Sequence, residues 1–314
     1  MKLPLLLPLL ALMTGCSSLP AAHRAPQLEG VEVVQLASGL GFTEGPVWIS
    51  EEQALVFSDI PASQLLRWSD ADGLGVLRES QNPNGNLLDL DGRLLTCRHG
   101  ARDLVRTEGD GTLTVLATHY EGRRLNSPND VAVDAGGALW FTDPPWGLSD
   151  WEAERELGGH WVFRLEPETG QVERVLDGTI MPNGIAFSPD GEVLYVADTG
   201  GNRRLPEALR TVPATLTAYR VMEGVRLDPE PLWRVETTCD GMAIDEYGNI
   251  YATGRTLTVW SPSGEPLGEL VVPEQPANCC FGGPDGRTLF ITARTGLYAA
   301  ELDVRGHRVT PAGR

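Results

Sequence analysis

One pattern occurs six times along this 314-residue sequence. Its most complete copy starts at Asn183, continues through an apolar run (Ile185–Phe187) and a turn (Ser188–Gly191), and ends with the β-rich run Val193–Ala197. The turn contains proline and glycine, which supply the fixed and the permissive backbone angles that tight turns need. Each copy begins with a short polar side chain, and these six leading residues are Glu44, Asn84, Asn129, Asn183, Asp240 and Asn278.

The spacing of the copies predicts the fold. Successive leading residues are 40, 45, 54, 57 and 38 positions apart, which leaves room for about four short strands in each unit. Glycine (36 residues) and proline (23 residues) suit a chain of many short strands and turns. Long helical periodicity is absent, and only Trp151–Leu157 is expected to form a helical turn or two, in a loop. We therefore predict an all-β chain folded as a six-bladed β-propeller.

Rotational symmetry predicts a binding site on the propeller axis, because equivalent positions in the six blades meet there. The leading residues offer carboxylate and amide oxygens and include neither Cys nor His, which is a donor set for a hard cation. The alternative is that Asn and Asp at strand starts only hydrogen-bond to turn backbones. That alternative suits Asn84 and Asn278, whereas Glu44 and Asp240 would be costly to bury together without a cation.

The N-terminal residues predict export. Lys2 is followed by an apolar run at residues 3–12 that is too short to span a bilayer, and small residues precede Cys16. This pattern resembles a bacterial lipoprotein signal, so we expect a signal peptide at residues 1–16, a tether at 17–28 and a propeller domain at 29–314. The protein would then be exported, lipid-anchored through Cys16 and periplasm-facing. The alternative is a secretory signal cleaved near Ala21.

Charge and cysteine content limit the partners. The formal net charge of −18 argues against nucleic acid and anionic membrane surfaces, so membrane attachment is expected only through Cys16. In an exported protein some of the remaining cysteines could pair, and buried free thiols are the simpler interpretation. No CxxC spacing indicates a zinc-thiolate site. These remaining cysteines are Cys97, Cys239, Cys279 and Cys280.

Several motifs, taken in order, resemble the gluconolactonase and regucalcin (senescence marker protein) family. The resemblance runs from about Glu44 to Gly296. It implies a six-bladed propeller that holds a divalent metal, usually Ca²⁺, in its axial channel and hydrolyses sugar lactones, while relatives hydrolyse other esters or organophosphates. The motifs that carry it are Glu44–Pro46, Asn126–Asp130, Phe141–Pro144, Pro182–Gly184, Asp240–Asp245 and Cys279–Gly283.

The resemblance also assigns metal ligands. Glu44, Asn183 and Asp240 match the family's ligands, and Asn129 matches a fourth position that is a ligand in some relatives and a substrate contact in others. We expect one divalent cation, Ca²⁺ in the first place, with Zn²⁺, Mg²⁺ and Mn²⁺ left open. The cation would act as a Lewis acid on the lactone carbonyl and lower the pKa of a bound water.

A carboxylate would then take the water proton. The family gives this role to the residue that matches Asp240. Because a cation depresses the pKa of a carboxylate bound to it, Asp198, Asp143 and His99 are kept as further candidates. His99 falls one residue past the place equivalent to Asp198, and the alternative is a surface histidine.

Asn129, Asp143 and Trp146 are the expected substrate contacts. Trp146 and Trp151 could form a sugar-stacking wall or lid, or could only pack, and Asp143 could simply cap the turn that follows it. Ser127 stands where animal lactonases of the family have an arginine that grips substrate hydroxyls, as in bacterial members, so the substrate remains open.

A metal-dependent lactonase is the favoured function. The alternatives are a non-catalytic propeller that binds Ca²⁺ or another ligand, and an esterase or phosphotriesterase that uses the same metal. We expect a small-molecule lactone as the partner and a monomer as the state. The sequence leaves open whether residues before Glu44 or after Leu297 close the ring.

Overall fold

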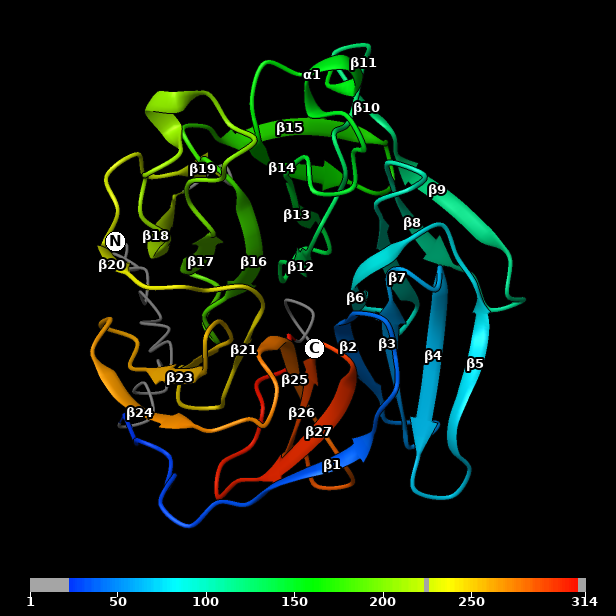
Figure 1. Ribbon diagram of the computed structural model, residues 1–314, viewed down its shortest axis with the longest axis vertical. Coiled ribbons are helices and arrows are strands. Elements are labelled where there is room, and N and C mark those ends of the chain that lie inside the picture. The colour runs from blue at the N-terminus through cyan, green and yellow to red at the C-terminus, as the bar shows by residue number, and fades with distance from the viewer. Residues whose placement is uncertain (1–22, 223–225, 310–314) are drawn as a thin grey trace, which may run out of the picture.

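The computed structural model describes residues 23–222 and 226–309. Six sheets of four or five strands surround a common centre, each with one strand next to the axis (Figure 1). The predicted all-β, six-bladed propeller is therefore confirmed. The predicted signal peptide and Cys16 lie outside the described residues.

The first three blades run outward from the axis in sequence order. Blade 1 consists of β2 (Thr43–Ile49), β3 (Ala54–Asp59), β4 (Gln64–Ser69) and β5 (Gly73–Glu79). Blade 2 consists of β6 (Pro83–Leu88), β7 (Leu94–Arg98), β8 (Asp103–Thr107) and β9 (Leu113–Ala117), and is followed by the hairpin β10 (His119–Tyr120) and β11 (Arg123–Arg124). Blade 3 consists of β12 (Val131–Val133), β13 (Leu139–Asp143), β14 (Trp161–Glu166) and β15 (Gln171–Leu176).

The other three blades repeat this order with two variations. Blade 4 consists of β16 (Pro182–Phe187), β17 (Val193–Asp198), β18 (Thr215–Met222) and β20 (Trp233–Glu236), and β19 (Arg226–Leu227) also pairs with β18. Blade 5 consists of β21 (Met242–Ile244), β22 (Ile250–Ala252), β23 (Leu257–Trp260) and β24 (Pro266–Leu270). Blade 6 consists of β25 (Pro276–Gly282), β26 (Thr288–Ala293), β27 (Gly296–Glu301) and β1 (Val33–Ala37).

The N-terminal strand closes the ring. β1 pairs antiparallel with β27, with Val33 opposite Ala300, so residues before Glu44 complete the last blade. The described end of the predicted tether lies against this region, because Arg24 pairs with Asp303. Blade 6 is therefore built from an early segment, β1, and three late strands of the chain.

Apolar layers between neighbouring blades form the core. One layer combines Leu104 of blade 2 with Phe141 and Phe163 of blade 3. Another joins the two ends of the ring, where Trp48 of blade 1 stacks on Phe290 of blade 6 with ring centroids 5.2 Å apart. Alternating side chains on twisted strands thus bind each blade to the next. The free thiols Cys97, Cys239 and Cys279 are buried, whereas the thiol residue Cys280 is partly exposed.

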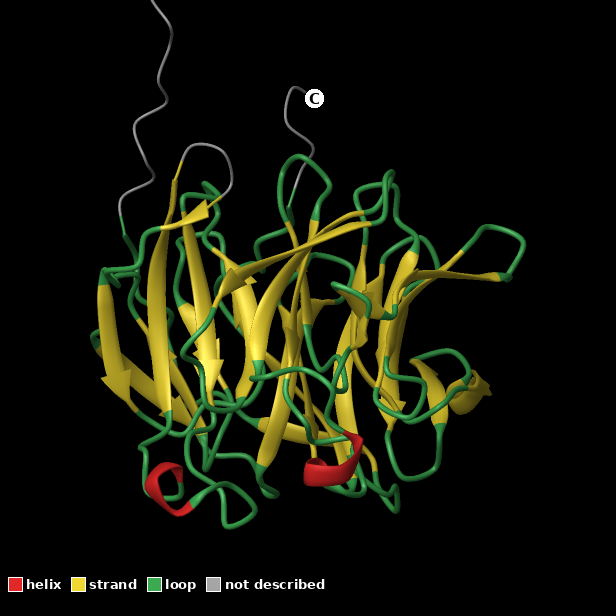
Figure 2. Ribbon diagram, turned by 90° about the horizontal axis from the view of Figure 1, so that it is seen from above, coloured by secondary structure: helices red, strands yellow, loops and turns green. Residues whose placement is uncertain are grey.

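The two faces of the propeller differ. One face, here called the loop face, carries the single-turn helix α1 (Trp151–Glu154) and the 3-10 turn η1 (Glu207–Leu209) (Figure 2). The opposite turn face carries the tight hairpin turns and the C-terminal segment, where Gly306 N donates to Gly286 O at 2.9 Å. α1 confirms the expected helical turn in that loop. In the described ranges no helix is long and apolar enough to cross a membrane.

Candidate active site on the propeller axis

The leading residues meet at the loop end of the axis. Main-chain hydrogen bonds join neighbouring innermost strands there: Gly85 N donates to Asn129 O at 2.8 Å, and Gly184 N donates to Asp240 O at 2.9 Å. Each donor follows the leading residue of one blade, and each acceptor is the leading residue of the next. These bonds bring Asn84 next to Asn129, and Asn183 next to Asp240, around the axis.

Glycine permits this close approach. Gly45 has a φ of +48°, and a Cβ there would lie 2.1 Å from Asn84 O. A Cβ at Gly184 would lie 2.2 Å from Asp240 O. Only a residue without a side chain fits at these places, so the glycine after a leading residue is what lets the inner strands crowd around the axis.

The strand pairing is irregular at the same positions. The register of β2 against β3 shifts between Glu44 and Val47, and that of β16 against β17 shifts between Pro182 and Ile185. The inner strands β6 and β25 have equivalent shifts. Bulges of this kind commonly re-aim side chains beside active sites, so the leading residues need not follow the regular alternation of the strand.

Burial separates Asp240 from the other leading residues. Five of them are buried, with exposed fractions of 4% for Glu44, 3% for Asn84, 4% for Asn129, 7% for Asn183 and 6% for Asn278. Asp240 is half-buried. It is therefore the leading residue that a small molecule at the loop face reaches most readily.

The two leading carboxylates influence each other's protonation. Burial raises the pKa of Glu44 well above its usual value, and the negative charge of Asp240 raises it further. Burial and the charge of Asp130 raise the pKa of Asp240 to about 7, while a hydrogen bond with Asn183 opposes this shift. Such coupling requires that the carboxylates lie near one another, as a shared cation would need.

Asp130 is a site residue that the sequence analysis missed. It is 8% exposed, burial raises its pKa to about 7, and its charge raises the pKa of both Glu44 and Asp240. The signal was present in the repeat, because Asp130 stands where glycine follows Glu44 and Asp240. Among the described residues no group of three or more His, Cys, Asp or Glu side chains forms a metal site, so the predicted ligand set depends on amide oxygens.

His99 lies against two leading residues. Its Nε2 is 3.0 Å from Asn84 Nδ2 and 3.5 Å from Asn129 Nδ2. The side chain is 5% exposed, so it is not a surface histidine. Burial lowers the pKa of His99 to about 4, which leaves the ring neutral at pH 7 and able to accept a hydrogen bond.

Asp143 and Asp198 bind the backbone that precedes the leading residues. Asp143 is fully buried, and its Oδ2 accepts a hydrogen bond from Asn126 N at 2.8 Å. Asp198 accepts hydrogen bonds from Ile180 N at 2.7 Å and Met181 N at 2.8 Å. Both carboxylates therefore bind the loop segments that lead into Asn129 and Asn183.

The first blade repeats this arrangement. Asp59, which ends β3, accepts hydrogen bonds from Gly41 N at 2.9 Å and Phe42 N at 3.2 Å. In three blades an aspartate thus holds the residues two or three positions before the leading residue. This repetition indicates that Asp143 and Asp198 position Asn129 and Asn183.

Trp146 lies in a loop that covers His99. Its ring packs edge-on against Trp151, with centroids 5.4 Å apart, and Trp146 remains partly exposed. A Cβ at the next residue, Gly147, would lie 2.5 Å from His99 Cβ. The loop that carries Trp146 is therefore beside the axial ring, while Trp151 is buried in an apolar cluster with Met181 and Leu205. A sugar-stacking role for Trp146 stays a prediction.

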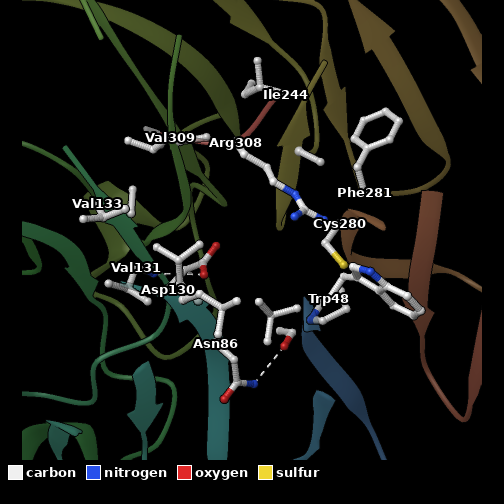
Figure 3. Close-up of a pocket in the computed structure, with 18 of the residues that line it drawn as sticks. Trp48, Asn86, Asp130, Val131, Val133, Ile244, Cys280, Phe281, Arg308 and Val309 are labelled. Carbon is white, nitrogen blue, oxygen red and sulfur yellow. Dashed lines mark hydrogen bonds between the residues drawn. The ribbon is translucent and has the colours of Figure 1, made fainter. Parts of the chain in front are cut away.

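A second space occupies the other end of the axis. It is a cavity of ≈ 370 Å³ lined mainly by residues that follow the leading residues along the inner strands, together with Asp130 and the leading residue Asn278, which border both the cavity and the ring. Figure 3 shows Trp48, Ile244 and Phe281 around it, with Arg308 and Val309 of the C-terminal segment at its edge. This largely apolar cavity lies on the turn side of the ring, away from His99 and Trp146.

The chain is similar to known lactonases over most of its length. A gluconolactonase from Zymomonas mobilis is 32% identical over 289 residues, which is 84% of this chain and 78% of that protein. A 6-deoxy-6-sulfogluconolactonase from Pseudomonas putida is 31% identical over 281 residues, 86% of this chain and 88% of that protein.

A solved structure and a family profile agree with these relatives. The structure of a gluconolactonase from Xanthomonas campestris matches with a TM-score of 0.78 at 34% identity, over 90% of this chain and 96% of the other. The profile described as the SMP-30/Gluconolactonase/LRE-like region matches residues 42–295. On the strength of that match, the chain belongs to the SMP-30/gluconolactonase/LRE-like family.

Proposed function

We propose that this protein is a lactonase that uses one divalent cation to open a sugar lactone. The observation that carries the proposal is the meeting of the Glu44 and Asp240 carboxylates with amide side chains at one end of the axis. The gluconolactonases among its relatives support the reaction class.

The donor set fits a hard cation. The carboxylates of buried Glu44 and half-buried Asp240 repel each other's charge, and a divalent cation would compensate that cost. Asn84 Oδ1 is buried without a hydrogen-bond partner among the described residues. Glu44, Asn129, Asn183 and Asp240 would hold the ion, and their oxygens suit Ca²⁺ best, with Mg²⁺ or Mn²⁺ as substitutes. When bound, the cation polarises the lactone carbonyl.

Asp240 is the proposed general base. It is the half-buried member of the ring, and Asn183 hydrogen-bonds to it and holds its orientation. Its carboxylate accepts a proton from the water that attacks the acyl carbon. The proton then returns to the ring oxygen as the acyl C–O bond breaks, which yields a hydroxy acid. Asp143 and Asp198 are engaged by the backbone and serve to position the site.

The substrate would lie between the ring and the loop that carries Trp146. Ser127 does not replace the arginine of the animal enzymes, because its hydroxyl donates to Pro144 O at 2.6 Å and accepts from Gly147 N at 2.9 Å. It shapes the loop instead. Recognition of the sugar hydroxyls therefore falls to Asn129 and to the exposed edge of Trp146.

The test is hydrolysis of gluconolactone and other aldonolactones by chelator-treated protein, with and without added Ca²⁺. We expect turnover only with the cation, and equal rates in both samples would contradict the metal-dependent mechanism. A panel of simple esters and phosphotriesters distinguishes the other hydrolase activities. A protein that binds Ca²⁺ but turns over nothing in either panel would be a binding propeller. Lipid attachment at Cys16 stays a separate prediction.

A further inference from the structure

Two leading asparagines that look alike in sequence have different surroundings. Asn278 Oδ1 accepts a hydrogen bond from Cys279 N at 2.8 Å, which is the local turn bond expected of a structural asparagine. Asn84 makes no such bond: its Oδ1 is buried and has no partner in the described part of the chain. A buried amide oxygen left without a partner is costly, which points to a ligand at this position.

The other side-chain atom and the main-chain oxygen of Asn84 have partners. Its main-chain oxygen accepts hydrogen bonds from Ser58 Oγ at 2.6 Å and from Asn86 Nδ2 at 3.0 Å. Its Nδ2 lies 3.0 Å from His99 Nε2. Other groups thus make the hydrogen bonds of this turn, and His99 holds the side-chain nitrogen of Asn84. The side-chain oxygen Oδ1 therefore remains available to a ligand.

His99 decides which way the amides face. An Asn side chain can present either its oxygen or its nitrogen, and the hydrogen-bond partner selects the orientation. The Nε2 atom of His99 meets the nitrogen of both Asn84 and Asn129. The residue is held at its main chain and at its Cβ, because His99 N donates to Asn82 O at 2.9 Å and Gly147 packs directly on the His99 Cβ.

We infer that His99 is a positioning residue of the axial cation site. As the Nδ1–H tautomer it accepts amide hydrogens from Asn84 and Asn129 at Nε2, which directs both amide oxygens to the ring. Asn84 then supplies an oxygen to the cation in addition to the four ligands named above. The inference rests on the proposed metal-dependent function. It makes His99 a positioning residue instead of a general base, and it adds Asn84 to the proposed ligands.

Calorimetric titration of Ca²⁺ into the chelator-stripped, dialysed protein tests this directly. We expect His99→Phe to raise the Kd for Ca²⁺ by roughly 10-fold to 100-fold, as the loss of an outer-shell partner commonly does, and Asn84→Ala, which removes a proposed ligand, to raise it by a similar factor. The double variant should be little worse than His99→Phe alone, because the effect of Asn84 is already included in the loss of His99, which orients both Asn84 and Asn129. His99→Gln, which keeps an acceptor oxygen, should recover much of the affinity. His307→Gln on the turn face is the matched histidine control, with an unchanged Kd.

The outcomes separate this inference from the proposed function. Unchanged Ca²⁺ affinity in both Asn84→Ala and His99→Phe would overturn the inference, and a fall in turnover without a change in Kd would assign His99 to catalysis instead. Wild-type protein that binds neither Ca²⁺, Mg²⁺ nor Mn²⁺ would overturn the proposed function itself. Thermal unfolding of every variant in chelator shows whether the metal-free fold is intact, and Asn84→Ala with His99→Gln suffices if His99→Phe does not fold.

Discussion

The same six inner strands line both ends of the axial channel, yet the two ends have opposite chemistry. At the loop face they begin with buried oxygen-bearing side chains, register shifts and glycines. At the turn face they line a largely apolar cavity with residues such as Trp48, Ile244 and Phe281, and polar groups such as Asp130 reach only its border with the ring. Regular pairing builds the scaffold, and the site forms where that pairing is interrupted. Changes at the two ends should therefore have very different consequences.

The largest difference is expected from Asp240→Asn. The variant keeps an oxygen for the cation but loses the proton acceptor, so kcat for gluconolactone should fall by about 10²- to 10⁴-fold. At the other end, Arg308→Gln changes a side chain that borders the largely apolar cavity, and its kcat should stay within about twofold of the wild type. Retention of full activity by the Asp240 variant would exclude it as the base.

A second difference concerns two glycines of blade 4. Gly184→Ala would place a Cβ 2.2 Å from Asp240 O, so the neighbouring strand must move. We expect a loss of about 3 kcal/mol in the free energy of unfolding, together with lower activity. Gly191→Ala lies in a hairpin turn with φ of +71° and open space around it, so it should cost about 1 kcal/mol and leave activity unchanged. Denaturant unfolding and kcat measure both effects.

Chelation should make the stability of the loop end depend on pH. Burial raises the pKa of Asp130 to about 7, and burial with neighbouring charge does the same for Asp240, whereas both titrate near 4 when unfolded. Their protonated forms are favoured in the fold, so this stability is complete below about pH 4 and is lost as the pH rises through 7. The midpoint temperature of chelated protein should therefore fall between pH 5 and pH 8.

Added Ca²⁺ should flatten that dependence, because the cation favours the ionised carboxylates. We expect an effect of about 2 kcal/mol, after allowance for solvent screening at half-buried Asp240. Thermal unfolding at several pH values, with chelator or with Ca²⁺, gives the comparison. The same slope in both series would show that these carboxylates do not share a cation.

The smallest effect is expected at the aromatic wall. Trp146→Phe keeps a ring against Trp151 but shortens the surface available to a sugar. KM for gluconolactone should rise by about threefold to tenfold with little change in kcat, since about 1 kcal/mol of stacking is at stake. A fall in kcat at unchanged KM would argue against a substrate contact.

The sequence predicted the blades and their convergence because a sixfold repeat leaves few ways to arrange equivalent positions. Three features escaped it for physical reasons. Asp130 lies just before the first paired residue of β12, Val131, so strand alternation does not tell whether its side chain faces the axis. Asp143 and Asp198 looked like free strand-end carboxylates until their backbone partners were known. The strand Val33–Ala37 precedes the first repeat and so carries no signature of its role in closure.

That closure has a kinetic consequence. The pairing of Val33 with Ala300 joins segments from opposite ends of the chain, and contacts so distant in sequence form slowly because a very long loop must be ordered first. β1 is therefore synthesised early but can pair only after β27 of blade 6 has been synthesised. Until β1 pairs with it, β27 has an unpaired edge, which is a template for association with other chains. Loss of β1 should therefore lower the yield of monomer before it affects the chemistry on the axis.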